Sequence, residues 1–160
     1  VLTDWLSIAA ILVMLGFALL GLVQLIGRKS LLRVDSGVLV LGVYYILVFC
    51  AYIFFEANVV NYRPVLIGGA LEPSYPSSTT MLVLCVMPTA MMQFSRLLRG
   101  IALKRAVNAA CGVFAAAMVL GRLCAGVHWL TDILGGLLLS AAFVTLYYAT
   151  DAYVSAKRHA

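Results

Sequence analysis

The chain has 160 residues, of which 64% are hydrophobic and only 11% are charged, with a mean hydropathy of +1.08 and a formal net charge of +5. A soluble domain carries roughly 25% charged residues, so this chain has too few to cover a water-facing surface. The composition excludes an ordinary soluble protein, and it makes the positive charge a property of membrane loops rather than a sign of nucleic-acid binding.

The apolar residues fall into long runs separated by short polar connections. A membrane-spanning helix needs about 20 mainly apolar residues, and five stretches reach or approach that length. The sequence therefore predicts an all-α fold, a polytopic membrane helical bundle that forms a single domain over residues 1–160. In chain order, the five predicted transmembrane helices are Trp5–Ile26, Val38–Phe55, Ser77–Phe94, Val107–Leu123 and Trp129–Tyr148.

The basic residues are distributed unevenly between the predicted connections. Nine of the eleven Lys and Arg residues lie on one side, and the positive-inside tendency makes that side cytoplasmic. We therefore expect a multi-pass plasma membrane protein with its N-terminus outside and its C-terminus in the cytoplasm. Because the chain begins at Val1 and its first helix would enter from outside, we also expect a further helix upstream. The nine residues are Arg28, Lys29, Arg33, Arg96, Arg99, Lys104, Arg105, Lys157 and Arg158.

The predicted outer side carries two arginines beside a histidine and an aspartate. Arg63 follows the second predicted helix, and Arg122 ends the fourth. His128 and Asp132 are four residues apart at the start of the fifth, so on a helix they share one face. Ionisable groups at this depth are costly and tend to face a cavity or a partner. We expect Asp132 to orient the imidazole, and the two guanidiniums to bind phosphate oxygens.

The third predicted helix opens with the segment Pro76-Ser77-Ser78-Thr79-Thr80, where free backbone N–H groups and hydroxyls favour an anion. Each feature alone has an ordinary explanation: an interfacial histidine, a structural Arg122–Asp132 salt bridge, or a capped helix start. Their common side and the spacing Arg-x5-His-x3-Asp together favour phosphoryl transfer.

At these residues the chain resembles the phosphatidic acid phosphatase type 2 superfamily, membrane lipid phosphatases that share a fold with vanadium haloperoxidases. That family has the motifs K-x6-R-P, P-S-x-H and S-R-x5-H-x3-D. The resemblance covers about residues 38–148, with the motifs in the family's order. The corresponding segments here are Glu56-x6-Arg63-Pro64, Pro76-Ser77-Ser78-Thr79 and Gly121-Arg122-x5-His128-x3-Asp132.

The resemblance implies a role for each matching residue. His128 would be the nucleophile that forms a phosphohistidine, and Asp132 would orient it. Arg63 and Arg122 would bind the substrate phosphate, and neither a metal nor another cofactor would be needed. Three further residues are expected to help bind phosphate: Ser77, Ser78 and Thr79.

Three positions depart from the family pattern. Glu56 stands where the family has a lysine that binds phosphate, and Gly121 stands where it has a serine. Thr79 stands in place of the histidine that acts as general acid, and a hydroxyl cannot serve as an acid near neutral pH. A positioned general acid contributes about 10²–10⁴ in rate, so these departures affect the expected chemistry.

The sequence favours an outward-facing, metal-independent phosphatase that acts on a lipid phosphate or a polyprenyl diphosphate in a bacterial-type plasma membrane. A diphosphate is attractive because its leaving group is itself a phosphate, which departs without an acid. The alternative is a catalytically weak or inactive relative that binds or transports an anionic lipid. A purely structural membrane subunit is a third interpretation, which the cluster of His, Arg and Asp makes least attractive.

Overall fold

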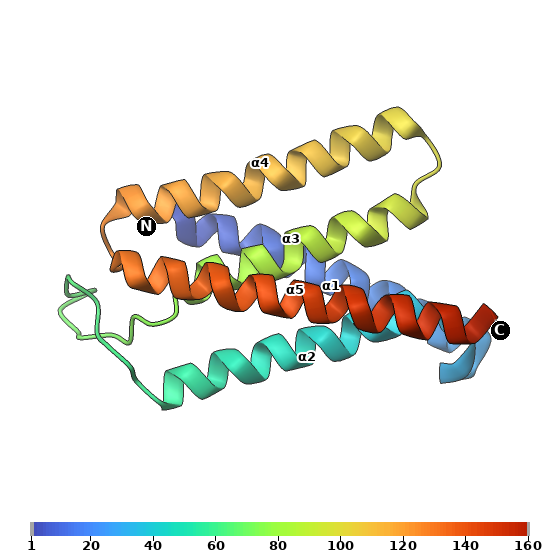
Figure 1. Cartoon of the computed structure of the whole chain (residues 1–160), viewed down its shortest axis with the longest axis horizontal. Helices are drawn as coiled ribbons and strands as arrows, with labels where there is room; N and C mark the ends of the chain where they lie inside the picture. The colour runs from blue at the N-terminus through green and yellow to red at the C-terminus, as the bar shows by residue number, and fades with distance from the viewer. Residues whose placement is uncertain (1, 160) are drawn as a thin grey trace.

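The structure, a computed structural model, describes residues 2–159. In this range five long helices run roughly along one axis, with their connections gathered at two ends (Figure 1). All five are long and apolar enough to cross a membrane, which confirms the predicted all-α membrane bundle. The elements are α1 (Leu2–Arg28), the 3₁₀ turn η1 (Leu31–Arg33), α2 (Ser36–Ala57), α3 (Ser78–Leu97), α4 (Ile101–Ala125) and α5 (Leu130–His159).

The helices extend beyond most of their predicted ends. The fourth begins at Ile101 rather than Val107, and the fifth ends at His159 rather than Tyr148. Thirty residues of helix rise about 45 Å, whereas the hydrocarbon core is about 30 Å thick. Hydropathy therefore marks where the chain leaves the apolar region, while helical hydrogen bonding continues through charged residues because Lys and Arg are good helix formers.

Helix α3 lies at the centre of the bundle and contacts each of the other four helices. Polar side chains join it to α5, and all of them except Arg96 are buried. The Gln93 amide donates to the Tyr147 hydroxyl, and the Arg96 guanidinium makes two hydrogen bonds to the Asp151 carboxylate, over 3.0 and 2.5 Å. Because burial of apolar surface does not drive association within lipid, such interhelical hydrogen bonds help to fix how helices pack.

The connection between α2 and α3 folds back on itself as an irregular hairpin over residues 58–77. The backbone N–H of Arg63 donates to the carbonyl of Glu72 over 3.1 Å, and the turn includes Gly69, whose φ of 83° suits a residue without a Cβ. The Tyr75 ring anchors the loop against α5. A Cβ on Gly135 would lie only 2.3 Å from this ring, so the close approach requires glycine there.

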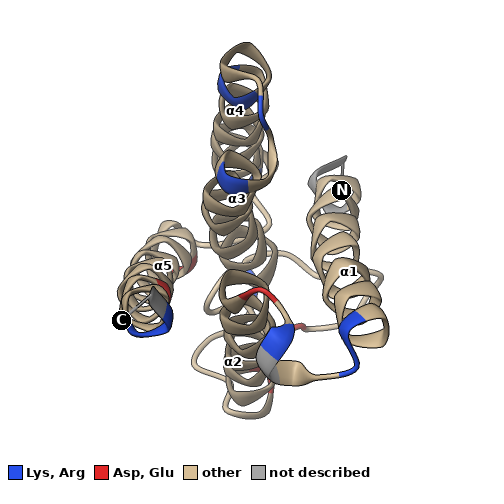
Figure 2. Ribbon diagram, turned by 90° about the vertical axis from the view of Figure 1, so that its right-hand side faces the viewer, with Lys and Arg blue, Asp and Glu red and all other residues tan. Residues whose placement is uncertain are grey.

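The two ends of the bundle differ in charge. One end, the site end, holds the 58–77 loop and the α4–α5 turn. The other, the basic end, holds the α1–α2 and α3–α4 connections and the end of α5, and Lys and Arg gather there (Figure 2). The nine basic residues that the sequence assigned to one side belong to segments at this end, as predicted.

Candidate active site

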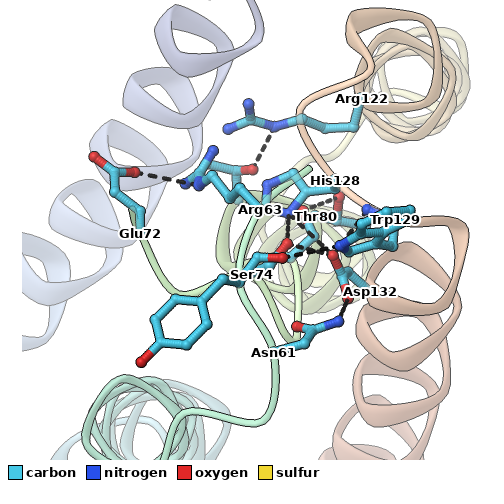
Figure 3. Close-up of polar contacts among 12 residues, drawn as sticks. Asn61, Arg63, Glu72, Ser74, Thr80, Arg122, His128, Trp129 and Asp132 are labelled. Carbon is cyan, nitrogen blue, oxygen red and sulfur yellow. Dashed lines mark hydrogen bonds and ion pairs between the residues drawn. The ribbon is translucent and has the colours of Figure 1, made fainter. Parts of the chain in front are cut away.

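The site begins at the turn between α4 and α5. Helix α4 ends at Ala125, and the capping residue Gly126 has a φ of 62°, a left-handed conformation common at helix C-termini. The chain then passes through His128 and enters α5 at Leu130, so that Asp132 lies in the first turn of that helix. The 58–77 loop reaches the same place and brings Ser74 next to both side chains (Figure 3).

The imidazole of His128 is held from one side. Its Nδ1 atom lies 3.2 Å from the Ser74 hydroxyl and 3.6 Å from the Asp132 carboxylate. The Ser74 hydroxyl in turn donates a hydrogen bond to Asp132. This chain of contacts fits the tautomer in which Nδ1–H donates to Ser74, leaving a lone pair on Nε2. The Nε2 atom is buried and has no hydrogen-bond partner among residues 2–159.

The Asp132 carboxylate is fixed by further donors. The Asn61 side chain donates to Oδ1 and the backbone N–H of Trp129 donates to Oδ2, each over 2.9 Å. The side chain is completely buried. Together with the hydrogen bond from Ser74, these donors hold the carboxylate in one orientation. Asp132 can therefore orient the histidine and stabilise positive charge on its ring.

Both predicted arginines reach the same site from different elements. The Arg63 guanidinium pairs with Glu72 over 3.2 Å within the loop. Arg122, which is 1% exposed, donates from Nε to the Thr79 hydroxyl over 2.6 Å. Both guanidinium groups lie near enough to His128 to disfavour its cation (Figure 3). The site thus places two cations beside an imidazole with an available lone pair, which suits binding and attack on a phosphate.

This environment keeps the His128 ring neutral. Its pKa is lowered from 6.5 to about 4, first because burial disfavours the cation and then because Arg63 and Arg122 repel it. Asp132 opposes the shift but does not cancel it. Near neutral pH the imidazole is therefore uncharged, which is the form that a nucleophilic histidine requires.

Two comparisons with known proteins bear on the family and the fold of this chain. The sequence model of the PAP2 superfamily matches residues 40–155, which is more than half of the chain. The chain belongs to the PAP2 superfamily. The fold is similar to the crystal structure of the first transmembrane PAP2 type phosphatidylglycerolphosphate phosphatase from Bacillus subtilis, with a TM-score of 0.70 and 22% identity, covering 96% of this chain and 76% of that chain. No curated protein is significantly similar in sequence.

The three residues expected to assist phosphate binding have different surroundings in this PAP2 fold. Ser77 is fully buried and its hydroxyl contacts that of Thr80 over 2.9 Å. Ser78 is partly buried and begins α3. Thr79 contacts Arg122 directly, as described above. Thr79 is thus next to a proposed phosphate ligand, and contact of Ser77 and Ser78 with phosphate stays a prediction.

The glutamate at the first PAP2 motif is at the rim of the site. Glu56 is exposed near the end of α2. It lines a small cavity together with Ser74 and Ser78. A carboxylate here makes the electrostatic potential near the two arginines less positive than a lysine would.

Among residues 2–159, no group of three or more His, Cys, Asp or Glu side chains is arranged to hold a metal ion.

Three residues at the site are not specified by the sequence motifs and were not predicted: Asn61, Glu72 and Ser74. Asn61 and Ser74 lie two positions before Arg63 and Pro76, just outside the recognised motifs. Only the folding of the loop, in which the Ser74 N–H donates to the Asn61 carbonyl over 3.0 Å, brings them together at Asp132. The sequence carries only a weak signal for these residues, which is that they are polar and lie near motif residues.

Proposed function

We propose that the protein is a membrane phosphatase that hydrolyses a lipid phosphate or polyprenyl diphosphate through a phosphohistidine on His128. One observation carries the proposal. The imidazole is neutral, its Nδ1 side is occupied by Ser74 and Asp132, and its buried Nε2 has no hydrogen-bond partner in the described chain, with two arginines nearby. Membership of the PAP2 superfamily supports the same reaction class.

In the proposed first step, the lone pair of His128 Nε2 forms a bond to phosphorus while the bond from phosphorus to the leaving oxygen breaks. The leaving group takes the electron pair of that bond. Arg63 and Arg122 bind the oxygens of the transferring phosphoryl group and stabilise its charge. Asp132, through its contacts to Nδ1 and to Ser74, stabilises the positive ring that forms.

In the proposed second step, water attacks the phosphorus of the phosphohistidine and the phosphorus–nitrogen bond breaks. Its electron pair returns to Nε2, and both water protons remain on the released phosphate until it exchanges with solvent. The guanidiniums supply the positive charge that a metal ion supplies in other phosphatases, so we propose a metal-independent reaction.

The substrate proposal rests on the departures from the family pattern. Thr79 occupies the place of the general acid, and its hydroxyl is bonded to Arg122. Without an acid, a leaving group of low pKa departs faster than an alkoxide. We therefore propose that diphosphates, whose leaving group is a phosphate, react faster than alkyl monophosphates.

A lipid substrate is supported by the apolar surface next to the site. A hollow of about 400 Å³ between α1, α2 and α3 is lined by side chains such as Ile11, Met14 and Phe49, and it reaches Ser78 and Thr79. A lipid chain can lie against these apolar side chains while its phosphate enters the polar site. We propose that this site faces outward across the plasma membrane, because the nine basic residues lie at the opposite end.

The second candidate function is a PAP2 protein that binds or transports an anionic lipid without hydrolysing it. It is favoured by the same two departures, Glu56 and Thr79, which remove a phosphate ligand and an acid. Phosphate release by purified protein from matched lipid monophosphates and diphosphates separates the candidates. The phosphatase proposal requires release that His128→Ala abolishes, and a phosphoryl adduct on His128 that is labile to acid and stable to base. Binding of the same lipids with no release by the unaltered protein supports the second candidate.

A further inference from the structure

A hollow separates α3 from α4 toward the basic end of the bundle, away from the candidate active site. Its volume is about 510 Å³. Its α3 side extends from Pro88 to Arg96, about 12 Å along the helix axis. Its lining is apolar nearer the middle of the bundle and polar nearer the end. The lining residues are Pro88, Met91, Met92, Ser95, Arg96 and Asn108.

The polar part of this hollow has capacity for a ligand. The Arg96 side chain pairs with Asp151 on α5 but is still 47% exposed. The Asn108 amide donates to the Ser95 hydroxyl over 3.2 Å. Its Oδ1 atom is buried and has no hydrogen-bond partner among residues 2–159. An unpaired amide oxygen costs free energy, and a rotation of the Asn108 side chain, which lines the hollow, would turn this oxygen toward a hydroxyl group of a ligand.

The chain segment beside the hollow carries positive charge that no acidic side chain balances. Arg99, Lys104 and Arg105 lie within the α3–α4 connection and the first two turns of α4, and no Asp or Glu occurs between Glu72 and Asp132 in the sequence. No ion pair involves these three side chains in the described residues. They also lie at the positive end of the α4 dipole, where cations are disfavoured unless an anion is present.

We propose that this hollow binds an anionic glycerophospholipid from the surrounding leaflet, with the headgroup phosphate at Arg99, Lys104 and Arg105. The headgroup or glycerol hydroxyls approach Asn108, and the upper part of a chain lies along Pro88 and Met92. The lining favours a lipid over a free anion because it changes from polar to apolar along the bundle axis, as a phospholipid does. This inference is independent of the proposed phosphatase activity.

Basic residues at a cytoplasmic end also set membrane topology, and that role alone requires no binding site. The topological role and the binding role differ in whether the location of each basic residue matters. A general electrostatic attraction depends on the number of charges at the basic end, whereas a site depends on the three charges beside the hollow and on the hollow itself. The chain offers a matched control because Lys29, Arg33 and Lys157 are exposed at the same end on other elements.

The test uses the full chain in nanodiscs of phosphatidylcholine, with or without phosphatidylglycerol, and measures lipid retention by native mass spectrometry and the thermal unfolding midpoint. We expect phosphatidylglycerol to be retained and to raise the midpoint. The triple variant Arg99→Gln, Lys104→Gln, Arg105→Gln should bind phosphatidylglycerol on the order of 100-fold more weakly. This factor corresponds to the summed attraction of three basic side chains to an anionic lipid surface. The control triple Lys29→Gln, Arg33→Gln, Lys157→Gln should retain most of the binding.

Two further variants test the hollow. Ser95→Leu and Asn108→Leu fill it from opposite helices, and each should reduce phosphatidylglycerol retention. Each also breaks the Asn108–Ser95 hydrogen bond, so both should lower the unfolding midpoint in pure phosphatidylcholine by a similar, small amount. Equal losses in the two triple variants, or normal retention in both filling variants, would overturn the proposal. So would an equal rise of the midpoint when glycerol phosphate is added to phosphatidylcholine nanodiscs, because the ligand would then be a free anion.

Discussion

The hydroxyl of Thr79 accepts a hydrogen bond from Nε of Arg122 over 2.6 Å. The PAP2 resemblance places a general-acid histidine at this position, whereas here the side chain orients an arginine proposed to bind phosphate. A buried guanidinium binds phosphate only if its N–H groups point toward the phosphate oxygens. We therefore expect the second-motif residue Thr79 to position Arg122 rather than to donate a proton.

The Thr79–Arg122 contact predicts a difference between two small substitutions. Thr79→Val removes the acceptor while keeping the shape, and Thr79→Ser keeps the hydroxyl. A hydrogen bond to a charged group contributes about 1.5–3 kcal/mol, so we expect Thr79→Val to weaken substrate binding by about 10–100-fold. Thr79→Ser should stay close to the original. The measurement is the KM or the Kd for a lipid diphosphate, and similar values for the two variants would contradict the positioning role.

Restoring the family's acid should change the order of substrates. Thr79→His is expected to raise the hydrolysis of alkyl monophosphates by part of the roughly 10²–10⁴ that a general acid supplies, and to change diphosphate hydrolysis less. The gain is partial, because the hydrogen bond to Arg122 is lost and Glu56 still lies at the rim. Adding Glu56→Lys should increase it. Equal rates for monophosphates and diphosphates with the original protein would show that no acid is missing.

The histidine contacts predict a graded series of losses. His128→Ala removes the nucleophile and should abolish phosphate release. Asp132→Asn keeps the shape but not the charge, and Ser74→Ala removes the hydroxyl between His128 and Asp132, so both should lower kcat more than they weaken binding. Loss of Ser74 should cost less, because the carboxylate still lies 3.6 Å from Nδ1. Phosphate release by His128→Ala at the original rate would exclude the phosphohistidine.

The charge environment of His128 predicts an acid titration. In a His159→Ala background, which leaves His128 as the single histidine, nitrogen NMR should find the ring neutral at pH 7, with protonation near pH 4. Arg63→Gln removes a cation that lowers this pKa, so its midpoint should move upward toward 6.5. Asp132→Asn removes the carboxylate that raises the pKa and should move it downward. A midpoint near 6.5 in the unaltered site would mean that neither burial nor the arginines act on the ring.

The charge asymmetry predicts the orientation in the membrane. Single cysteines, introduced after the four native ones are replaced, should react with an impermeant reagent from outside near Asn61 and Glu72. Cysteines near Lys29 and Arg99 should react only after the membrane is permeabilised, which gives the reagent access to the cytoplasmic side. The physical reason is the gathering of nine basic residues at one end of the bundle. The reverse labelling pattern would place the candidate active site in the cytoplasm.

The sequence by itself determined the membrane class and the five apolar helices of the described chain, and it predicted the four side chains at the centre of the candidate site. Apolar runs of spanning length are local properties, and the spacing of His128 and Asp132 fixes their common face on any helix. Helix ends were less well predicted, because α5 continues past its apolar part to His159. The hydropathy pattern reports the thickness of the apolar region, whereas the helix end depends on backbone hydrogen bonds that charged residues also support.

Only the tertiary structure decided what surrounds those side chains. Ser74 lies 54 positions before His128 in the chain, yet it contacts both His128 and Asp132 because the 58–77 loop folds back over α5. The partners of Arg122 and Arg63, which are Thr79 and Glu72, also depend on this packing. Such contacts join residues that are distant in sequence or placed by an irregular loop, and no helical or strand period connects them. The same holds for the hollow between α3 and α4, because its lining comes from two helices whose packing no sequence period specifies.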